Sequence, residues 1–291
     1  MLKILKDAKI LIEILEARSM SLVSGIFTLP YSYVRLAYQQ TSLKFSLEER
    51  SDLGSETICK GDSRYAEVLK KLPGSHLKAD MQPFLDKSGV RKDLIFFETP
   101  NIGLCSAVGT NRFTKGAAII RVAPGFCEAD KEACSWSMKH EISHVKNDDL
   151  FLMYSVRCIC QLAASFFGMS CLSFFPAIGL AWTVGIVSQA LFIQRQEARA
   201  DDFAIENSSN EELQGGRRFL IAAKEVTLQE RNTFWKRIII SVEGNDRSDI
   251  LHPSITSRIH KVEKALRARN INVPAEKGKI ESLKQYVMTL C

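Results

Sequence analysis

The longest hydrophobic stretch of the chain extends from residue 158 to residue 193 and contains no Asp, Glu, Lys or Arg. An uncharged run of this length is far longer than an ordinary core helix. Phe175-Pro176-Ala177 divides it into two legs of about 26 Å each as helix, against a hydrocarbon core of about 30 Å. We therefore expect a hydrophobic helical hairpin over residues 151–194. It could cross a bilayer twice, enter it to half depth, or be buried as a helical pair within protein.

The first 45 residues combine a charged amphipathic segment with an apolar one. Residues 1–18 carry Leu and Ile at helical spacing, with Lys and Glu on the remaining sides. Residues 20–34 are apolar but short for a span, and Pro30 interrupts them. We expect residues 1–45 to associate with a membrane, either as an interfacial anchor or as a further insertion into the bilayer. A helix packed on the rest of the protein is the alternative.

Two short segments, residues 94–98 and 117–123, have the composition of β-strands. A stretch without Pro or Gly, residues 128–150, follows them and predicts a helix. Asp130 suits the N-cap of this helix, and Glu132 places negative charge in its first turn. The expected fold is α+β and mostly helical, with a small sheet and the hydrophobic hairpin inserted after this helix.

Within the predicted helix, His140-Glu141-Ile142-Ser143-His144 places two imidazoles one turn apart with a carboxylate beside the first. Such imidazoles can converge on one zinc ion at about 2.0–2.1 Å. Met138 and Val145 would pack on the opposite face, and Asn147 shares the face of the imidazoles. Asn147 is therefore a candidate to support the ligands. A helix that carries surface His and Glu without a metal is the alternative.

A catalytic zinc of this type requires a third protein ligand and an open position for water. Glu197, beyond the hydrophobic hairpin, is our candidate for the third ligand, and it requires the hairpin to turn back. Asp201 lies one helical turn further and could accept a hydrogen bond from a ligating imidazole. A solvated charge near Arg195 and Arg199 is the alternative for Glu197, and the pairing with the two histidines favours the ligand.

Charge and cysteine content narrow the range of partners and compartments. The formal net charge of +6 suits an anionic membrane surface, but 39 Lys and Arg against 33 Asp and Glu is not the excess of a nucleic-acid-binding protein. Positive residues flank both ends of the hydrophobic stretch, which favours a catalytic part on the cytoplasmic side of a membrane. The eight cysteines form no regular framework and fit a reducing compartment.

The sequence HEISHVKNDD at residues 140–149, an apolar stretch and then ExxAD at residues 197–201 resemble the HtpX-type and CAAX-prenyl-protease-type membrane zinc metallopeptidases. The resemblance covers about residues 90–262. It includes His252-Pro253 through Arg258-Ile259, which is similar to the late HPxxxxRI element of that family. The family's Asn-Ala-Phe-Ala-like edge strand has only a looser counterpart in Ser106-Ala107-Val108-Gly109. The resemblance implies a zincin-like metallopeptidase domain with Glu197 as the third ligand.

The same resemblance implies roles for two late residues. His252 would stabilise the oxyanion of the reaction, and Arg258 would brace the ligand carboxylates. The alternative for His252 is a residue at a helix N-terminus, before Pro253 at the first helical position.

These expectations define a membrane-associated zinc endopeptidase with one Zn²⁺ per chain. Glu141 would take a proton from the water that the metal activates and pass it to the leaving amine. The expected partners are polypeptides and the lipid bilayer, with no nucleic acid. The resemblance implies that misfolded or membrane proteins are among these polypeptides. The peptidase domain would comprise residues 46–150 and 195–291. A membrane-anchored binding or scaffold protein with an inert metal site is the alternative function.

Overall fold

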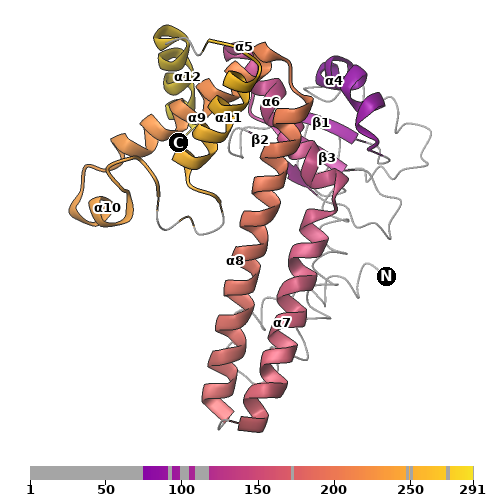
Figure 1. The fold of residues 1–291 in the computed structure, drawn as a ribbon, viewed down its shortest axis with the longest axis vertical. Helices are drawn as coiled ribbons and strands as arrows, with labels where there is room; N and C mark the ends of the chain where they lie inside the picture. Colours follow the sequence, from indigo (N-terminus) through magenta and orange to yellow (C-terminus); the bar gives the residue numbers. More distant parts are fainter. Residues whose placement is uncertain are drawn as a thin grey trace, which may run out of the picture. The chain divides into compact units, whose positions relative to one another are not determined.

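A computed structural model describes residues 75–90, 94–98, 105–108, 118–171, 174–246, 249, 252–272 and 276–290. The chain divides into two compact units, one of residues 58–149 and 193–291 and the other of residues 1–57 and 150–192. The described part is mostly helical with one small sheet, as predicted (Figure 1). The expected membrane-associating segment at residues 1–45 lies outside the described residues.

The sheet of the first unit has three strands in the order β1-β3-β2. The central strand β3 (Ala118–Val122) pairs parallel with β1 (Leu94–Glu98) and antiparallel with β2 (Cys105–Val108). This confirms the strands predicted at residues 94–98 and 117–123. Side chains from β1 and β3, including Phe96 and Ile120, are buried together with residues of α4 (Ser75–Ser88) and of the helix that carries the histidines.

That helix, α6 (Lys131–Lys146), has the predicted N-cap, since Asp130 accepts a hydrogen bond from the backbone N–H of Ala133 at 3.0 Å. Its predicted inner face is confirmed, because Met138, Ile142 and Val145 are all buried. Helix α6 is thus fixed at its start by the cap and along one side by the core, which leaves its other side for polar residues.

Helix α9 (Asn210–Gln229) packs closely on α6. The approach depends on two glycines: a Cβ atom at Gly215 would lie 2.4 Å from the backbone nitrogen of Ala133, and one at Gly216 would lie 2.5 Å from the ring of Trp136. Arg218 of α9 is buried and donates two hydrogen bonds to Asp130, the N-cap of α6. The remaining helices of this unit are α5 (Phe126–Ala129), α10 (Phe234–Ile239), α11 (Ile255–Ala268) and α12 (Lys277–Leu290).

The hydrophobic stretch forms two helices, α7 (Asp149–Cys171) and α8 (Phe174–Asn207). The division between the two helices comes before Phe175-Pro176-Ala177, where it was predicted. Pro176 lies in the first turn of α8, and its missing N–H removes no helical hydrogen bond there. Within the hairpin, Arg157 donates to Gln189 at 3.1 Å. Helix α8 continues past the hydrophobic stretch, so Glu197 belongs to the same helix as the second leg.

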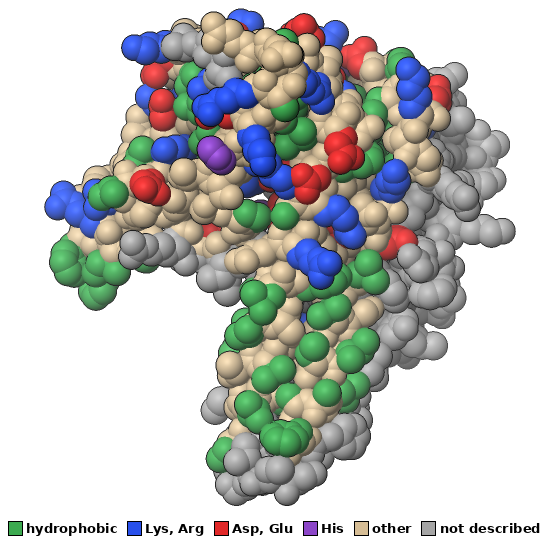
Figure 2. All heavy atoms as spheres, viewed as in Figure 1, with side chains coloured by type: hydrophobic (Ala, Val, Ile, Leu, Met, Phe, Trp, Pro, Cys, Tyr) green, Lys and Arg blue, Asp and Glu red, His purple; other side chains and the backbone are tan. Residues whose placement is uncertain are grey.

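Several large apolar side chains of the hairpin are exposed, and Figure 2 shows hydrophobic side chains along α7 and α8. In the described part of the chain, however, no helix is both long enough and apolar enough to cross a membrane, so the first of the three alternatives for the hairpin, two crossings of a bilayer, has no support there.

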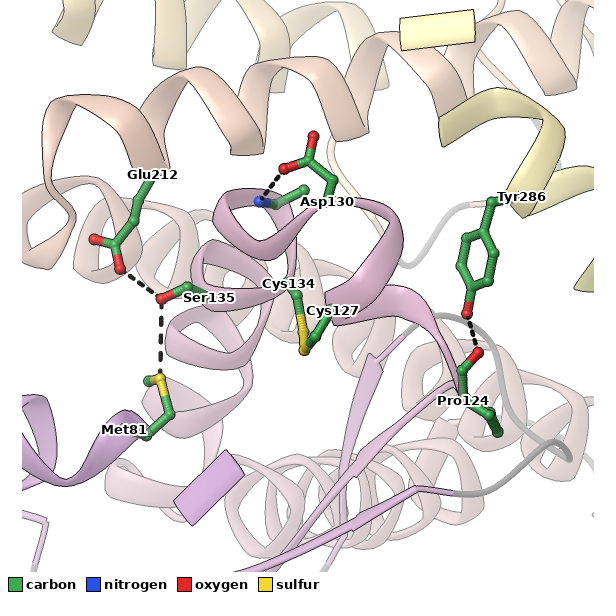
Figure 3. Close-up of a disulfide and its surroundings, with 9 residues drawn as sticks. Met81, Pro124, Cys127, Asp130, Cys134, Ser135, Glu212 and Tyr286 are labelled. Carbon is green, nitrogen blue, oxygen red and sulfur yellow. Dashed lines mark hydrogen bonds between the residues drawn. A yellow bond between two sulfur atoms is a disulfide. The ribbon is translucent and has the colours of Figure 1, made fainter. Parts of the chain in front are cut away.

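A disulfide joins Cys127 of α5 to Cys134 of α6 (Figure 3). The sequence analysis expected no disulfide framework and a reducing compartment. The pairing arises from tertiary geometry, because the turn between α5 and α6 brings the two Cα atoms to 5.0 Å. These cysteines are seven positions apart in the sequence, a spacing that matches no common disulfide or zinc motif.

Candidate metal centre

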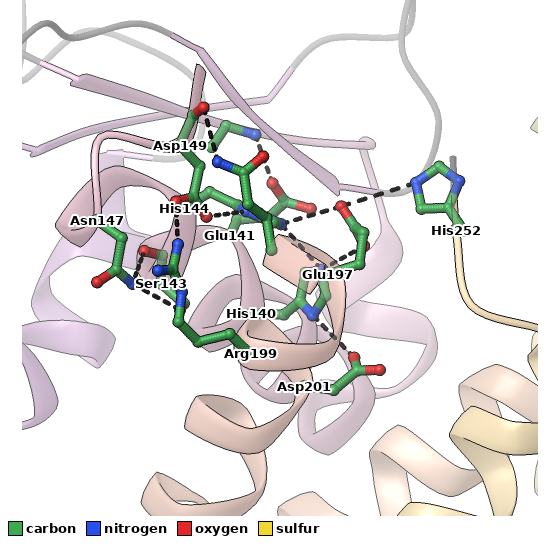
Figure 4. Close-up of polar contacts among 12 residues, drawn as sticks. His140, Glu141, Ser143, His144, Asn147, Asp149, Glu197, Arg199, Asp201 and His252 are labelled. Atoms are coloured by element: carbon green, nitrogen blue, oxygen red, sulfur yellow. Dashed lines mark hydrogen bonds and ion pairs between the residues drawn. The ribbon is translucent and has the colours of Figure 1, made fainter. Parts of the chain in front are cut away.

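Three side chains from two helices converge at one point (Figure 4). His140 and His144 extend from α6, and Glu197 extends from α8. The two Nε2 atoms lie 3.2 Å apart. Glu197 places one carboxylate oxygen 3.2 Å from His140 Nε2 and the other 3.3 Å from His144 Nε2. The structure thus brings together the three predicted ligands in a largely buried group that could hold a metal ion.

The spacing of these atoms is compatible with a small divalent cation. Ligands arranged tetrahedrally around an ion at about 2.0–2.1 Å lie about 3.3–3.4 Å from one another. The 3.2 Å between the two Nε2 atoms is close to this edge length, and each Nε2 has a different oxygen of Glu197 at 3.2 or 3.3 Å. Two imidazole nitrogens and a carboxylate are also a donor set that zinc commonly uses.

The electrostatics of the group favour a cation at this point. Burial alone would lower the pKa of His144, but hydrogen bonds with Asp149 and Glu197 outweigh it and raise the pKa to about 10. Burial would raise the pKa of Glu197, but hydrogen bonds with His140 and His144 outweigh it and hold the pKa well below its usual range. Protons on the imidazoles thus offset the negative charge in the metal-free protein. Metal binding would release them.

Asp201 faces His140 on the side away from the metal position. Its Oδ1 lies 3.0 Å from His140 Nδ1, an ion-pair distance between the two groups for which the sequence analysis expected a hydrogen bond. An Nδ1–H directed at a carboxylate leaves the lone pair of Nε2 for a metal. Arg258 donates to both oxygens of Asp201, at 2.8 and 2.9 Å. Arg258 thus braces the carboxylate behind a ligand rather than the ligand carboxylate itself.

His144 has an equivalent support that the sequence analysis missed. Asp149 Oδ2 lies 2.8 Å from His144 Nδ1, and Arg199 forms an ion pair with the other oxygen. Asp148 adopts a left-handed backbone conformation, with φ at 54°, which Asp tolerates better than most residues. This residue lies between the C-cap of α6, Asn147, and the first residue of α7, Asp149. The signal in the sequence was the pair of aspartates directly after the helix, but their placement depends on the turn between the two helices.

Glu141 lies beside the metal group without belonging to it. Its Oε2 accepts a hydrogen bond from the backbone N–H of Ala107, in strand β2, at 2.7 Å. Burial raises the pKa of Glu141, and the nearby imidazoles oppose the rise only in part. Glu141 is therefore a carboxyl group whose proton affinity is tuned toward neutral pH, next to a group that could hold a metal.

His252 approaches the same group from the segment before α11. Its Nε2 lies 3.8 Å from Glu197 Oε1, and Asp249 contacts its Nδ1 at 2.9 Å. The side chain is 45% exposed. The N-cap of α11 is Ser254, so Pro253 precedes the helix and is not its first residue. The alternative for His252, a residue at a helix N-terminus with Pro253 at the first helical position, is therefore wrong.

The described hydrogen bonds of Asn147 go to the end of its own helix and not to His140 or His144. It is the C-cap of α6, and its side-chain amide donates to the carbonyl oxygen of Ser143 at 2.8 Å and to the hydroxyl at 3.3 Å. Its described hydrogen bonds therefore close the end of the helix. Asp149, two residues further, makes the contact to an imidazole that the sequence analysis expected from this part of the chain.

Comparison with known proteins gives no match to a family model, to a curated protein or to a solved structure. The resemblance to the HtpX-type and CAAX-prenyl-protease-type families, and with it the zincin-like fold, stays a prediction.

Proposed function

We propose that this protein is a zinc-dependent endopeptidase. One observation carries the proposal: a His-His-Glu group with metal-ligand spacing lies next to a carboxyl group, Glu141, that is not a ligand and has a raised pKa. This combination of three protein ligands and a separate base is the one that water-activating zinc hydrolases use.

His140, His144 and Glu197 would hold one zinc ion per chain. A bound zinc ion lowers the pKa of a water molecule toward neutrality and polarises a carbonyl group. Asp201 and Asp149 keep the ring Nδ1 atoms as hydrogen-bond donors, so that both Nε2 atoms are available as ligands. The arginine behind each aspartate forms an ion pair with it and holds it in place.

Glu141 would act as the general base and then as the general acid. A base works best when its pKa is near the working pH, and burial moves the pKa of Glu141 in that direction. The carboxyl group would take a proton from the attacking water and transfer it to the leaving amine. His252, 3.8 Å from Glu197, is close enough to the ligand group to donate to the oxyanion that develops on the substrate carbonyl.

Strand β2 offers a way to hold a polypeptide. It lies at one edge of the sheet, and its residue Ala107 contacts Glu141. An extended substrate segment that adds to this edge would run past the general base and present its carbonyl groups to the metal position. Because such pairing uses backbone hydrogen bonds, it suits unfolded or misfolded polypeptides of varied sequence.

We also propose that the protein associates with a membrane, with the catalytic unit on the cytoplasmic side. The support is the set of exposed apolar side chains on the hairpin and the positive charges at its ends. Five of these side chains are 50–65% exposed: Ile159, Phe167, Trp182, Val187 and Leu191. Membrane proteins are accordingly the substrates that such a peptidase would meet.

The test is the zinc content and peptidase activity of three variants beside the wild type. Glu197→Ala should lose the zinc, whereas Glu141→Gln should keep about one zinc per chain and lose cleavage of an unfolded protein substrate. Glu206→Ala is the matched control, since Glu206 lies exposed on the same helix as Glu197. A folded wild-type protein without zinc would refute the proposal. Zinc binding without any cleavage would favour the alternative, a binding protein with an inert metal site.

A further inference from the structure

Helix α10 and the residues after it expose an unusual amount of apolar surface. Phe234 is 70% exposed, Trp235 72%, Ile238 50% and Val242 76%. In α10 no residue is buried. The helix has six residues, and so short a helix is not stable by itself in water. Phe234, Trp235 and Ile238 share one face of it, and Figure 2 shows hydrophobic side chains gathered at its position in Figure 1.

The segment is held at its base, so these side chains are presented outward by a fixed scaffold. Ile240, directly after α10, is fully buried, and Arg231 donates to its carbonyl oxygen at 3.0 Å. Further along, Asn245 Oδ1 accepts hydrogen bonds from the backbone N–H of Thr256 at 3.1 Å and from its hydroxyl at 2.9 Å. The hydrogen bonds between Asn245 and Thr256 tie the segment to α11, whose start lies close to His252 in the chain.

The charges beside the apolar face are mostly positive, although Lys236 pairs with Glu230, whose Oε2 lies 2.7 Å from its Nζ. Between Glu230 and Glu243 the chain has three cationic residues, Arg231, Lys236 and Arg237, and no acidic residue. Lys236 and Arg237 are exposed and directly follow the aromatic pair. Exposed aromatic side chains next to Lys and Arg are typical of segments that sit in the interface of a membrane with anionic lipids.

We infer that the segment from Phe234 to Val242 inserts its apolar face into an anionic lipid surface and holds the metal centre close to that surface. The four exposed side chains offer roughly 500 Å², given 150–250 Å² for a whole aromatic side chain. A stable protein partner buries about 800 Å² on each side and needs a complementary shape. A lipid surface needs neither. The inference does not depend on the proposed hydrolysis, because it concerns a surface outside the metal group.

The position of Trp235 in the bilayer can be measured directly. The chain has three tryptophans, of which Trp136 is buried and Trp182 lies on the hairpin. In full-length Trp182→Phe protein, Trp235 is therefore the accessible one. On vesicles of phosphatidylcholine with phosphatidylserine, we expect the emission of Trp235 to shift to shorter wavelength and to be quenched by lipids brominated in the acyl chain.

Variants test the two parts of the surface separately. Phe234→Ala with Trp235→Ala should weaken partitioning onto these vesicles at least about tenfold. Lys236→Gln with Arg237→Gln should lower the gain from phosphatidylserine by about fivefold for each charge. Met288→Ala, on α12 and 48% exposed, is the control and should partition as the wild type does. Since α10 has no buried residue, the variants in this helix should keep the wild-type unfolding temperature.

Three results would overturn the inference. The first is vesicle-bound protein in which Trp235 is not quenched by the brominated lipids. The second is a full-length chain that does not bind the vesicles. The third is a blue shift of Trp235 that rises with protein concentration in the absence of lipid, which would assign the apolar face to a second copy of the chain.

Discussion

Asp149 and Asp201 allow the candidate metal centre to be perturbed without removing one of its proposed ligands. Each lies against one imidazole Nδ1, at 2.8 and 3.0 Å respectively. We predict that Asp149→Asn and Asp201→Asn each weaken zinc binding about 10- to 100-fold, or about 1.4–2.7 kcal/mol. Asn keeps the size of the side chain and an oxygen that accepts the ring N–H. The loss therefore reports the negative charge that makes the ligating nitrogen more basic.

The two variants should differ in the stability of the metal-free protein. The side chain of Arg258, the partner of Asp201, is 15% exposed, whereas that of Arg199, the partner of Asp149, is 46% exposed. Removing the charge of Asp201 leaves a largely buried guanidinium without its counter-ion, which costs about 3–5 kcal/mol. Arg199 can be hydrated when Asp149 is neutralised, so that variant should lose about 1 kcal/mol or less.

Zinc affinity would be measured by competition with a chromophoric chelator, and stability by urea unfolding of the metal-free proteins. Asp202→Asn is the matched control, since Asp202 adjoins Asp201 in the chain but is 56% exposed and pairs with Lys261 at the surface. It should behave as the wild type in both assays. Wild-type zinc affinity in Asp149→Asn would refute the assignment of Asp149 as the support of His144. Equal loss of stability in the two variants would refute the argument from burial.

Three further predictions concern packing and charge. Arg218→Met should lower the free energy of unfolding by about 3–5 kcal/mol, because it leaves Asp130 buried without its counter-ion. Burial would raise the pKa of Asp130, but its hydrogen bonds with Arg218 outweigh this and lower the pKa. The stability from this pair is therefore present above about pH 4 and lost as the pH falls through the folded pKa. In urea unfolding, the difference in stability between the wild type and Arg218→Met should therefore become smaller in acid. Gly215→Ala should cost about 1–3 kcal/mol in thermal unfolding because its Cβ meets the backbone of α6, whereas Gly278→Ala, with nothing within 4 Å, should not destabilise. Glu141→Gln should stabilise the metal-free protein by about 0.5–2 kcal/mol in the same assay, since it removes a desolvated charge; a destabilised variant would make Glu141 a structural contact to β2.

The sequence predicted those features that local patterns determine. The cap at Asp130 and the apolar face of α6 follow from residue types at fixed helical spacing, and both are present. The convergence of Glu197 with the histidines was also predictable, although the residues lie more than fifty positions apart. A hairpin between two helices returns the chain to its starting point, so an acidic residue just after the hairpin was a strong candidate.

The features that sequence analysis missed depend on tertiary geometry. The side chain of Asp149 contacts His144 across Asp148, which takes a left-handed backbone conformation between α6 and α7. The disulfide of Cys127 depends on the turn between α5 and α6, for which the spacing gave no signal. The sequence also did not predict that the apolar face of α10 is exposed, because an apolar segment in a helical region normally predicts burial.

The surroundings of Glu141 bear on the choice between the proposed peptidase and a binding protein with an inert metal site. A metal site that only stabilises a fold gains from its ligands and from the groups that orient them, and Asp149, Asp201 and their arginines supply that support. Glu141 contributes to neither. Burial raises its pKa, so its charged form opposes folding in the metal-free protein. A side chain that is unfavourable for stability and lies beside a group that could hold a metal fits the proposed proton-transfer reaction better than it fits an inert site.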